Sequence, residues 1–320
     1  MIKYRENRND IIQRVEIDLT EIPAQGRQDL ESKITKYLKN IDKKYRHTFR
    51  FGAGNKLVYE TEVLIPKVNK NRLNLLMVLG NPAVHSVAER MFFSYEKTPT
   101  QGKWREHRFW RALRDCRILR FRSDLKNPTC ENIEKINACK RDWLLNGEYE
   151  SKFNIFLLPY FSFPTPASRA YNGVNGIKKI VGTEIFKEMR EFEYQRFKGI
   201  VLCNDIKNVI CFQKTNVLKE IKQRTKCEQV KSILNDPHYP VYKLDDTLKY
   251  VTLYYAGSTK SILTDEGKKI LRGVVADIKA KNKVGLPLPN GESQRGEAPL
   301  KKSFPLPLIE GEGDKGDGVT

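Results

Sequence analysis

The sequence predicts an α/β protein with three layers, α/β/α, in which helices cover both faces of a central, mainly parallel four-stranded sheet. Short apolar runs alternate with longer segments of helical periodicity, and this order is typical of a parallel sheet covered by helices on both faces. The predicted strands are residues 73–79, 153–158, 199–203 and 249–255. The predicted helices are residues 106–119, 129–146, 174–195, 206–225 and 264–281. With 320 residues the chain can bury a sizeable core, in one large domain or two small ones.

Residues 1–69 are predicted to form an N-terminal extension made of a helix and a hairpin. Residues 1–26 are polar and mixed, which favours an irregular or docking segment. Apolar side chains then recur at helical spacing, namely Leu30, Ile34, Tyr37, Leu38 and Ile41. Residues 48–65 are rich in aromatic and β-branched residues around a Gly-Ala-Gly-Asn turn, which predicts a hairpin. The turn is not a phosphate-binding loop, because the lysine and the helix that follow such a loop are missing.

The composition changes at the C-terminus. Residues 283–320 contain five prolines and seven glycines and show no hydrophobic period. Such a segment cannot bury enough apolar surface to offset the entropy lost on ordering, so we expect a disordered tail. Residues 70–282 remain as the α/β domain.

The net charge indicates a polyanionic partner. The formal net charge is +19, and the last 38 residues hold five basic and six acidic groups, so the positive excess belongs to the body. Such an excess is typical of proteins that bind DNA, because each neutralised phosphate releases condensed counterions. A basic protein that its charge keeps soluble is the alternative that composition leaves open.

The sequence predicts no membrane segment, metal site or cofactor. Residues 1–10 are polar, and no apolar run approaches the ~20 residues of a membrane helix, so we expect a cytoplasmic protein. We also expect a monomer. The six cysteines contain no Cys-x-x-Cys pair and are expected to be reduced, with little support for an iron–sulfur cluster; they are Cys116, Cys130, Cys139, Cys203, Cys211 and Cys227.

Residues 75–110 contain an ordered series of motifs. The apolar run 75–79 ends in Gly80-Asn81-Pro82, which places a polar amide at the sheet edge where α/β enzymes hold their reactive groups. The pair Phe92-Phe93 follows, and then His107-Arg108-Phe109-Trp110. The order of these parts resembles the uracil-DNA glycosylase superfamily. Its mismatch-specific branch has a strand, Gly-x-Asn-Pro-Gly and a helix that opens on Asn-Arg-Phe-Trp, and its hypoxanthine-type branch has an aromatic pair before a similar Phe-Trp.

The resemblance covers roughly residues 70–281 and implies a sheet of uracil-DNA glycosylase type. In that family an asparagine at the position of Asn81 orients the water that hydrolyses the N-glycosidic bond. The resemblance further assigns Gly80, Pro82 and Phe93 to a base pocket, with the Phe93 ring stacking on a base turned out of the duplex. In the loop after the second strand, where relatives read the base, Tyr160 or Phe163 could close over it; a rigid proline-rich turn packed with aromatic residues is the alternative. Taken alone, Asn81-Pro82 is typical of a turn and a phenylalanine pair is typical of a core.

Two departures from the family pattern surround these motifs. Residues 96–104 are inserted before the Phe-Trp helix, and His107 stands where the family has asparagine. His85, three residues after Pro82, is a second catalytic candidate because a histidine can donate a proton near neutral pH. A loop histidine without a role is the alternative.

Two segments are candidates for DNA contacts. The helix that begins near residue 106 carries a dense series of arginines, of which we single out Arg108, Arg111 and Arg114 as phosphate ligands. A solvated helix face is the alternative. After the fourth strand, the small and hydroxylated residues Gly257, Ser258, Thr259 and Lys260 occupy the place of the family's second motif, which pinches the DNA backbone. The histidine and proline of that motif are missing here, and an ordinary capped loop is the alternative.

The resemblance predicts a monofunctional DNA glycosylase that removes uracil or another deaminated base from damaged or mismatched duplex, or from single-stranded DNA. A catalytically inactive nucleic-acid-binding protein of the same fold is the main alternative, and the incomplete second motif favours it. A different α/β hydrolase or a nucleotide-binding enzyme is a third hypothesis, but the chain has neither the Gly-x-Ser-x-Gly motif of the first nor the phosphate loop of the second.

Overall fold

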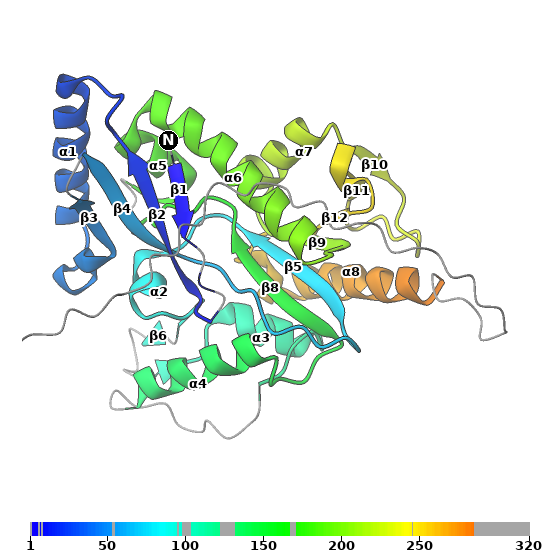
Figure 1. The fold of residues 1–320 in the computed structure, drawn as a ribbon. Helices are drawn as coiled ribbons and strands as arrows, with labels where there is room; N and C mark the ends of the chain where they lie inside the picture. The colour runs from blue at the N-terminus through cyan, green and yellow to red at the C-terminus, as the bar shows by residue number, and fades with distance from the viewer. Residues whose placement is uncertain are drawn as a thin grey trace, which may run out of the picture.

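The computed structural model describes residues 2–5, 7, 9–52, 55–94, 96–97, 104–121, 132–166, 171–244 and 246–284. Its centre is a six-stranded sheet with the order β10-β11-β12-β9-β5-β8 (Figure 1). The strands are β5 (Leu73–Leu79), β8 (Phe153–Pro159), β9 (Asn208–Cys211), β10 (Glu228–Val230), β11 (Val241–Lys243) and β12 (Thr252–Tyr255). The neighbours β12, β9, β5 and β8 pair in parallel, whereas β10 and β11 add antiparallel pairs at one edge. The α/β class is confirmed, and the predicted four strands are corrected to a mixed sheet of six.

The third predicted strand was wrong. Residues 199–203 form the end of helix α6 (Thr183–Cys203), and the strand that enters the sheet is β9, a few residues later. A short apolar run does not distinguish a buried strand from the buried side of a helix. Ile200 and Val201 are buried on that helix. The helix predicted at 206–225 consequently shrinks to a π-turn (Lys214–Leu218) and α7 (Lys219–Thr225).

The N-terminal extension contains a second sheet. Four antiparallel strands lie in the order β1-β2-β4-β3, with bounds Ile2–Arg5, Ile12–Asp18, Lys56–Glu62 and Phe49–Gly52. The predicted hairpin is therefore β3–β4, and the predicted helix is α1 (Ala24–Lys39). Residues 1–26, expected to be irregular, supply β1 and β2 instead, and β2 pairs with β4 along its full length. A short 3-10 helix, η1 (Lys43–Thr48), joins α1 to β3.

Two hydrophobic cores lie on the two faces of the central sheet. Leu76 and Val78 of β5 face the first core, with side chains of α1, α6, the N-terminal sheet and α5 (Gly173–Val181). Leu75 and Met77 face the second core, with side chains of α3 (Arg108–Asp115) and α8 (Asp265–Val284). Alternate residues of one strand thus contact opposite layers, as a sheet covered on both faces requires. Figure 1 shows α6 and α8 on either side of the strands.

The remaining helices follow the sequence prediction with local changes. The predicted helix 174–195 is interrupted by Gly182, whose φ of +84° separates α5 from α6. Residues 133–146 form α4 (Ile133–Asn146), which ends at Gly147 in the left-handed conformation. Residues 285–320, most of the predicted tail, lie outside the described residues, and Lys283 and Val284 belong to the last turn of α8. Within the described part of the chain, no helix is both long and apolar enough to cross a bilayer.

Candidate active site at the carboxyl edge of the sheet

The carboxyl ends of the four parallel strands meet at one edge of the sheet. From β5 the chain crosses to β8 on one side, and it then returns across β5 to β9 on the other side. Neighbouring strands whose connections leave in opposite directions create a crevice at their carboxyl ends, and α/β proteins bind ligands there. Gly80-Asn81-Pro82 follow β5, and Gln213 lies just after β9. The predicted asparagine is therefore at the position where this topology places a binding site.

Asn81 is held in one orientation by two acceptors. Its Nδ2 donates to Oγ1 of Thr165 at 2.7 Å and to the carbonyl oxygen of Pro82 at 3.1 Å. The carbonyl can only accept, so the amide nitrogen must point to it and the side-chain oxygen must point elsewhere. No hydrogen bond from a described residue reaches Oδ1, and the side chain is partly exposed. Asn81 can therefore accept a hydrogen bond from a water molecule.

The loop after β8 is bonded to the segment that carries Asn81. Backbone N–H groups of Tyr160, Phe161 and Thr165 donate to the carbonyl oxygens of Leu79, Gly80 and Pro82 at 3.0 to 3.1 Å, and the N–H of Val84 donates back to Thr165 at 3.2 Å. Oγ1 of Thr165 also accepts from the N–H of Gly173 at 3.2 Å. Thr165, which the sequence did not single out, thus links Asn81 to the start of α5.

Gln213 borders the same place from the neighbouring strand. A Cβ atom on Gly80 would lie 2.7 Å from Oε1 of Gln213, so the absence of a side chain at Gly80 lets this amide approach the backbone. Oε1 of Gln213 is buried and has no hydrogen-bond partner among the described residues. This amide oxygen, next to the residue that precedes Asn81, is a second hydrogen-bond acceptor at this edge of the sheet. Gln213 was not predicted, because the third strand was placed too early in the sequence.

Phe92 and Phe93 have different environments. Phe92 is fully buried, whereas Phe93 is partly exposed and has a φ of +47°. The Phe93 ring stacks on His107 and Phe109, with centroid distances of 4.7 and 4.3 Å. Nε1 of Trp110 donates to the carbonyl oxygens of both phenylalanines at 3.1 Å, which holds the strained backbone in place. One phenylalanine is thus a core residue, and Phe93 stays a candidate for stacking on a base.

The two histidines of this region have different surroundings. His107 precedes α3, and its Nδ1 accepts the N–H of Phe109 at 3.2 Å, so it caps the helix as the family's asparagine could. His85 is an exposed residue of the short helix α2 (Val84–Ala88). Its position one turn after Asn81 agrees with the predicted neighbourhood, and its catalytic role stays a prediction.

The three candidate arginines of α3 are not equivalent. Arg114 binds Glu106 at 2.8 Å, and Glu106 also binds Lys140 at 2.5 Å. Burial lowers the pKa of Lys140, against the opposing charge of Glu106. Arg114 is therefore part of a structural ion-pair network. Arg108 and Arg111 are only partly buried, and among the described residues neither pairs with a carboxylate, so they stay the better candidates for phosphate contacts.

The loop after β12 is a compact capped turn. The Ser258 N–H donates to Oγ of Ser261 at 2.9 Å, and the Ser261 N–H donates to Oγ of Ser258 at 3.2 Å. Gly257 has a φ of +85°, and a Cβ there would lie 2.9 Å from Oγ of Ser261. The Ser258 hydroxyl is thus used within the loop. Lys260 is exposed and Thr259 is partly exposed, so these two residues could still reach a phosphate.

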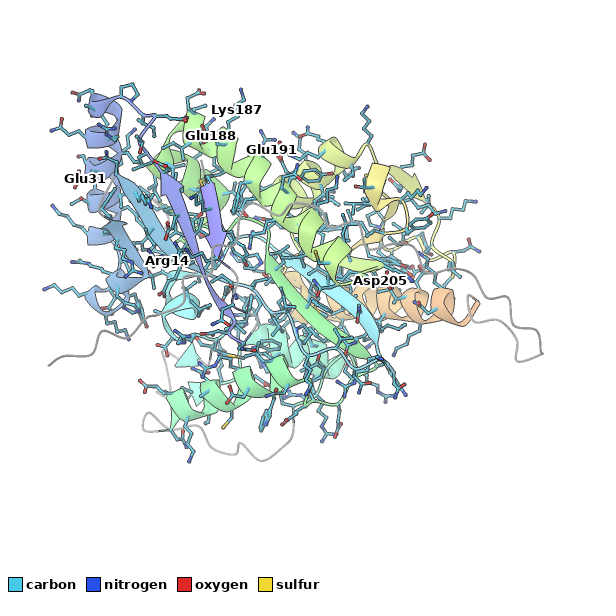
Figure 2. The ribbon with its side chains drawn as sticks, viewed as in Figure 1. Arg14, Glu31, Lys187, Glu188, Glu191 and Asp205 are labelled. Carbon is cyan, nitrogen blue, oxygen red and sulfur yellow. The ribbon has the colours of Figure 1, made fainter. Side chains whose placement is uncertain are left out.

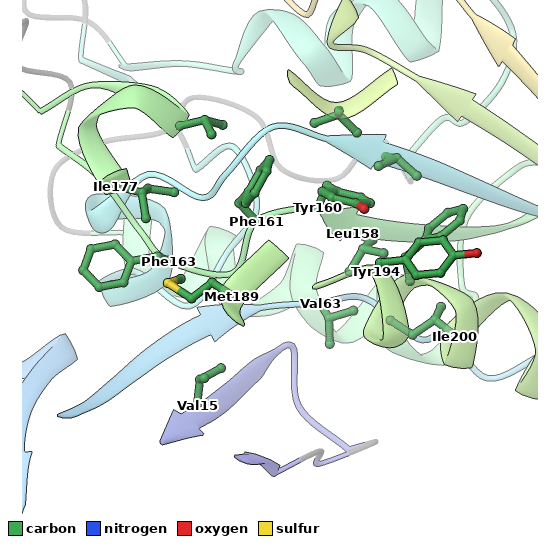
Figure 3. Close-up of a cluster of buried hydrophobic side chains, with 14 of the residues drawn as sticks. Val15, Val63, Leu158, Tyr160, Phe161, Phe163, Ile177, Met189, Tyr194 and Ile200 are labelled. Carbon is green, nitrogen blue, oxygen red and sulfur yellow. The ribbon is translucent and has the colours of Figure 1, made fainter. Parts of the chain in front are cut away.

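Tyr160 is buried in the first core, contrary to its prediction as a base-binding residue. Its ring and that of Phe163 are 0% exposed. Figure 3 shows Tyr160 within the first core, together with Leu158, Phe161 and Tyr194. Burial raises the pKa of the Tyr160 phenol far above its usual range. The aromatic residues of this loop stabilise its fold, so neither can close over a base without unpacking the core.

A buried ion pair lies beneath the same loop. Oε1 of Glu193 accepts from the N–H of Ser162 at 2.6 Å and also from its hydroxyl. Nε of Arg196 donates to Oε2 of Glu193 at 2.8 Å, and the guanidinium also donates to the carbonyl oxygens of Pro159 and Tyr160. Burial raises the pKa of Glu193, although the Arg196 charge and the bonds from Ser162 oppose the shift. The pair satisfies four polar groups of the loop.

The N-terminal extension contacts this loop directly. The Tyr37 hydroxyl donates to the carbonyl oxygen of Pro164 at 2.7 Å, and the Tyr59 hydroxyl lies 2.8 Å from Oγ of Ser162. Both contacts are buried. Tyr37 comes from α1 and Tyr59 from β4, so both parts of the extension fix the loop that in turn holds Asn81 through Thr165.

Within the described ranges, no group of three or more His, Cys, Asp or Glu side chains is arranged to hold a metal ion. The five cysteines in those ranges have free thiols. Comparison with known proteins finds no family model that matches this chain and no curated protein sequence that resembles it.

Proposed function

We propose that the chain is an N-glycosyl hydrolase of uracil-DNA glycosylase type, which removes a deaminated base from DNA. The observation that carries the proposal is the geometry of Asn81. Its amide nitrogen is fixed by Thr165 and Pro82, and no described residue donates a hydrogen bond to its oxygen, at the carboxyl edge of the sheet. A fixed acceptor of this kind can hold a water molecule in place before the reaction, so little reorganisation is needed in the transition state.

The proposed reaction is the hydrolysis of the bond between the sugar C1′ and the base nitrogen. The base turns out of the duplex and rests against Phe93, which is partly exposed next to two further aromatic rings. As the bond breaks, its electron pair leaves with the base and the sugar becomes cation-like. The water on Asn81 then adds to C1′ and releases its proton to solvent. Arg108 and Arg111 hold flanking phosphates in this scheme.

A binding protein without catalysis remains the second candidate. The reciprocal bonds between Ser258 and Ser261 favour it, because they occupy the loop that in the family assists departure of the base. The unpartnered oxygen of Asn81 favours the enzyme, because a binding-only protein has no need for a fixed water acceptor.

A panel of labelled duplexes separates the two candidates. Each duplex carries one uracil, hypoxanthine, xanthine or mismatched thymine, and alkali cleaves the strand wherever a base has been removed. The enzyme proposal expects cleavage of at least one member by the full chain. Binding to the panel without any cleavage would support the second candidate, and the absence of binding would reject both.

A further inference from the structure

The N-terminal extension carries a dense set of exposed cations. Six basic side chains between residues 33 and 50 are exposed, and we call them the N-terminal basic surface; they are Lys33, Lys36, Lys39, Lys43, Lys44 and Arg50. Asp42 is the single acidic residue in this interval. None of the six forms an ion pair with a described carboxylate, in contrast to Arg190 and Arg224, which bind Glu220. These charges are therefore not neutralised by carboxylates in the described part of the chain, and only Lys44 lies over an aromatic ring, that of Tyr45 at 4.6 Å.

This surface begins beside the candidate site. The short 3-10 helix η1, which carries Lys43 and Lys44, packs against α2, the helix that follows Asn81-Pro82. The Tyr45 hydroxyl donates to Oε1 of Glu89, the residue that follows α2, at 3.4 Å. The segment after α2 is joined to α3 by the bonds from Trp110 to Phe92 and Phe93. Helix α2 contacts the basic extension, and the segment that follows α2 contacts the arginine-bearing helix α3.

The surface spans several base pairs of a duplex. Its part on α1, from Lys33 to Lys39, corresponds to about 10 Å of helix, or about three base pairs of DNA, and η1 continues it with Lys43 and Lys44. The C-terminal end of α1 leads into η1, so α1 extends from the neighbourhood of α2 outward (Figure 1). Figure 2 shows the side chains of α1, on which Glu31 is labelled, extending away from the body. Lys36 and Lys39 belong to this helix.

We propose that the N-terminal basic surface binds the phosphate backbone of duplex DNA on one side of the extruded base. Arg108 and Arg111 of α3 then contact the backbone on the other side. The inference rests on the proposed function, because the base held at Asn81 sets the register of the DNA. It also gives a role to a part of the chain that the family resemblance leaves unexplained.

The test compares two triple variants on two duplexes. Lys36→Gln with Lys39→Gln and Lys43→Gln removes three charges from the basic surface. The matched control, Lys219→Gln with Lys231→Gln and Lys243→Gln, removes three exposed charges near α7, β10 and β11, at the opposite end of the molecule (Figure 1). Each duplex carries one 2′-fluoroarabino analogue of deoxyuridine, which resists hydrolysis. One duplex extends far to the 5′ side of the analogue, and the other extends far to the 3′ side.

The dissociation constant of each protein is measured against salt concentration. The first triple variant should bind one of the two duplexes at least about tenfold more weakly near 0.1 M salt, and its salt slope should fall by about one for each lost contact. Its affinity for the other duplex, and both affinities of the control variant, should stay within about twofold of the parent chain. Equal melting temperatures establish that all variants are folded.

Three outcomes would overturn the inference. They are an unchanged salt slope, equal losses on both duplexes, and equal losses in the control variant, since each means that these lysines make no local contact with DNA. All three leave the proposed function intact, because the parent chain still binds. Failure of the parent chain to bind either duplex would instead reject the proposed function.

Discussion

At the residue scale, the surroundings of Asn81 predict a loss of turnover without a loss of affinity. Asn81→Ala removes the acceptor for water but leaves Phe93 and the arginines in place. A group that acts only in the transition state lowers turnover and hardly changes ground-state binding, and the loss of one such group costs about 10²- to 10³-fold. Single-turnover excision and the affinity for the uncleavable duplex are the two measurements.

The control for this prediction is Asn282→Ala, which removes a partly exposed asparagine from α8, where its amide bonds only to its own helix. The control should excise at the parent rate. Turnover of the Asn81→Ala variant near the parent rate would remove Asn81 from the mechanism.

Glu62 predicts an unusual dependence of stability on pH. It is 4% exposed, and its Oε2 has no partner among the described residues. Burial raises the pKa of this carboxyl well above its usual range. Between the unfolded and the folded pKa, the folded state binds more protons than the unfolded chain. The free energy of unfolding should therefore be fully retained below the unfolded pKa, near 4.3, and decrease as the pH rises through the folded pKa.

The Glu62→Gln variant should remove this decrease, because its side chain stays neutral. Its urea midpoint, compared with that of the parent chain, should move upward between about pH 4 and pH 8. Glu60→Gln, on the same strand but partly exposed, is the matched control and should follow the parent curve. If the urea midpoints of all three proteins changed with pH in parallel, ionisation of Glu62 would not destabilise the native state.

At the element scale, the hydrophobic pattern of the sequence correctly predicted those strands and helices whose own residues show a clear period. Strand β5 matches its prediction residue for residue, and α8 begins within one residue of its own. The failures have a common cause. The run at 199–203 is apolar in either conformation, and β1 and β2 are recognisable only through their pairing with each other and with β4. A short polar segment can become a strand by pairing with distant residues, and its own sequence then shows no hydrophobic period that would predict it.

The candidate site likewise contains residues that a local motif indicates and residues that only the fold brings to the site. Asn81 and Phe93 belong to one strand-loop-helix motif, so the sequence could indicate them. Thr165 and Gln213 come from the loops after two other strands, and only the strand order brings them to Asn81. Tyr160 was misassigned because an aromatic residue in a loop can point toward a binding site or into the core, and the ring of Tyr160 is buried in the core.

The loop of residues 159–166 provides a prediction at this scale. Tyr59→Phe removes the hydroxyl that contacts Ser162 and keeps the ring in the core. Loss of one buried hydrogen bond should lower the free energy of unfolding by about 1 kcal/mol. The larger effect should be faster hydrogen exchange in residues 159–166 and 80–84, because the two segments share backbone bonds.

The control is Tyr250→Phe, because Tyr250 is 74% exposed and lies far from this loop in sequence. Hydrogen exchange followed by mass spectrometry reports both segments in one experiment. Exchange that rises only near Tyr59, with residues 80–84 unchanged, would show that the extension does not support the Asn81 segment through this loop.

At the scale of the whole molecule, the N-terminal extension and the α/β body share one core. Leu30, Ile34 and Tyr37 of α1 belong to the same cluster as Phe163 and Ile177 of the body. The backbone continues this contact, since Leu64 pairs with Leu157 of β8. The extension is therefore part of the folding unit, although the family resemblance begins only near residue 70.

This shared core predicts opposite results for two truncations. A chain of residues 1–284 ends with α8 and should keep the melting temperature of the full chain within a few degrees, because every core residue is retained. A chain of residues 66–284 loses eleven large side chains of the first core, from Val15, Ile17, Leu19, Leu30, Ile34, Tyr37, Ile41, Phe49, Leu57, Tyr59 and Val63. Their removal exposes apolar side chains of the body that they cover, among them Phe163 and Ile177, and each newly exposed side chain costs about 1.5–3 kcal/mol, against the roughly 5–15 kcal/mol by which domains are usually stable. Calorimetry should therefore show a cooperative transition for the first fragment and none for the second, and a cooperative transition in residues 66–284 would establish the body as an independent domain.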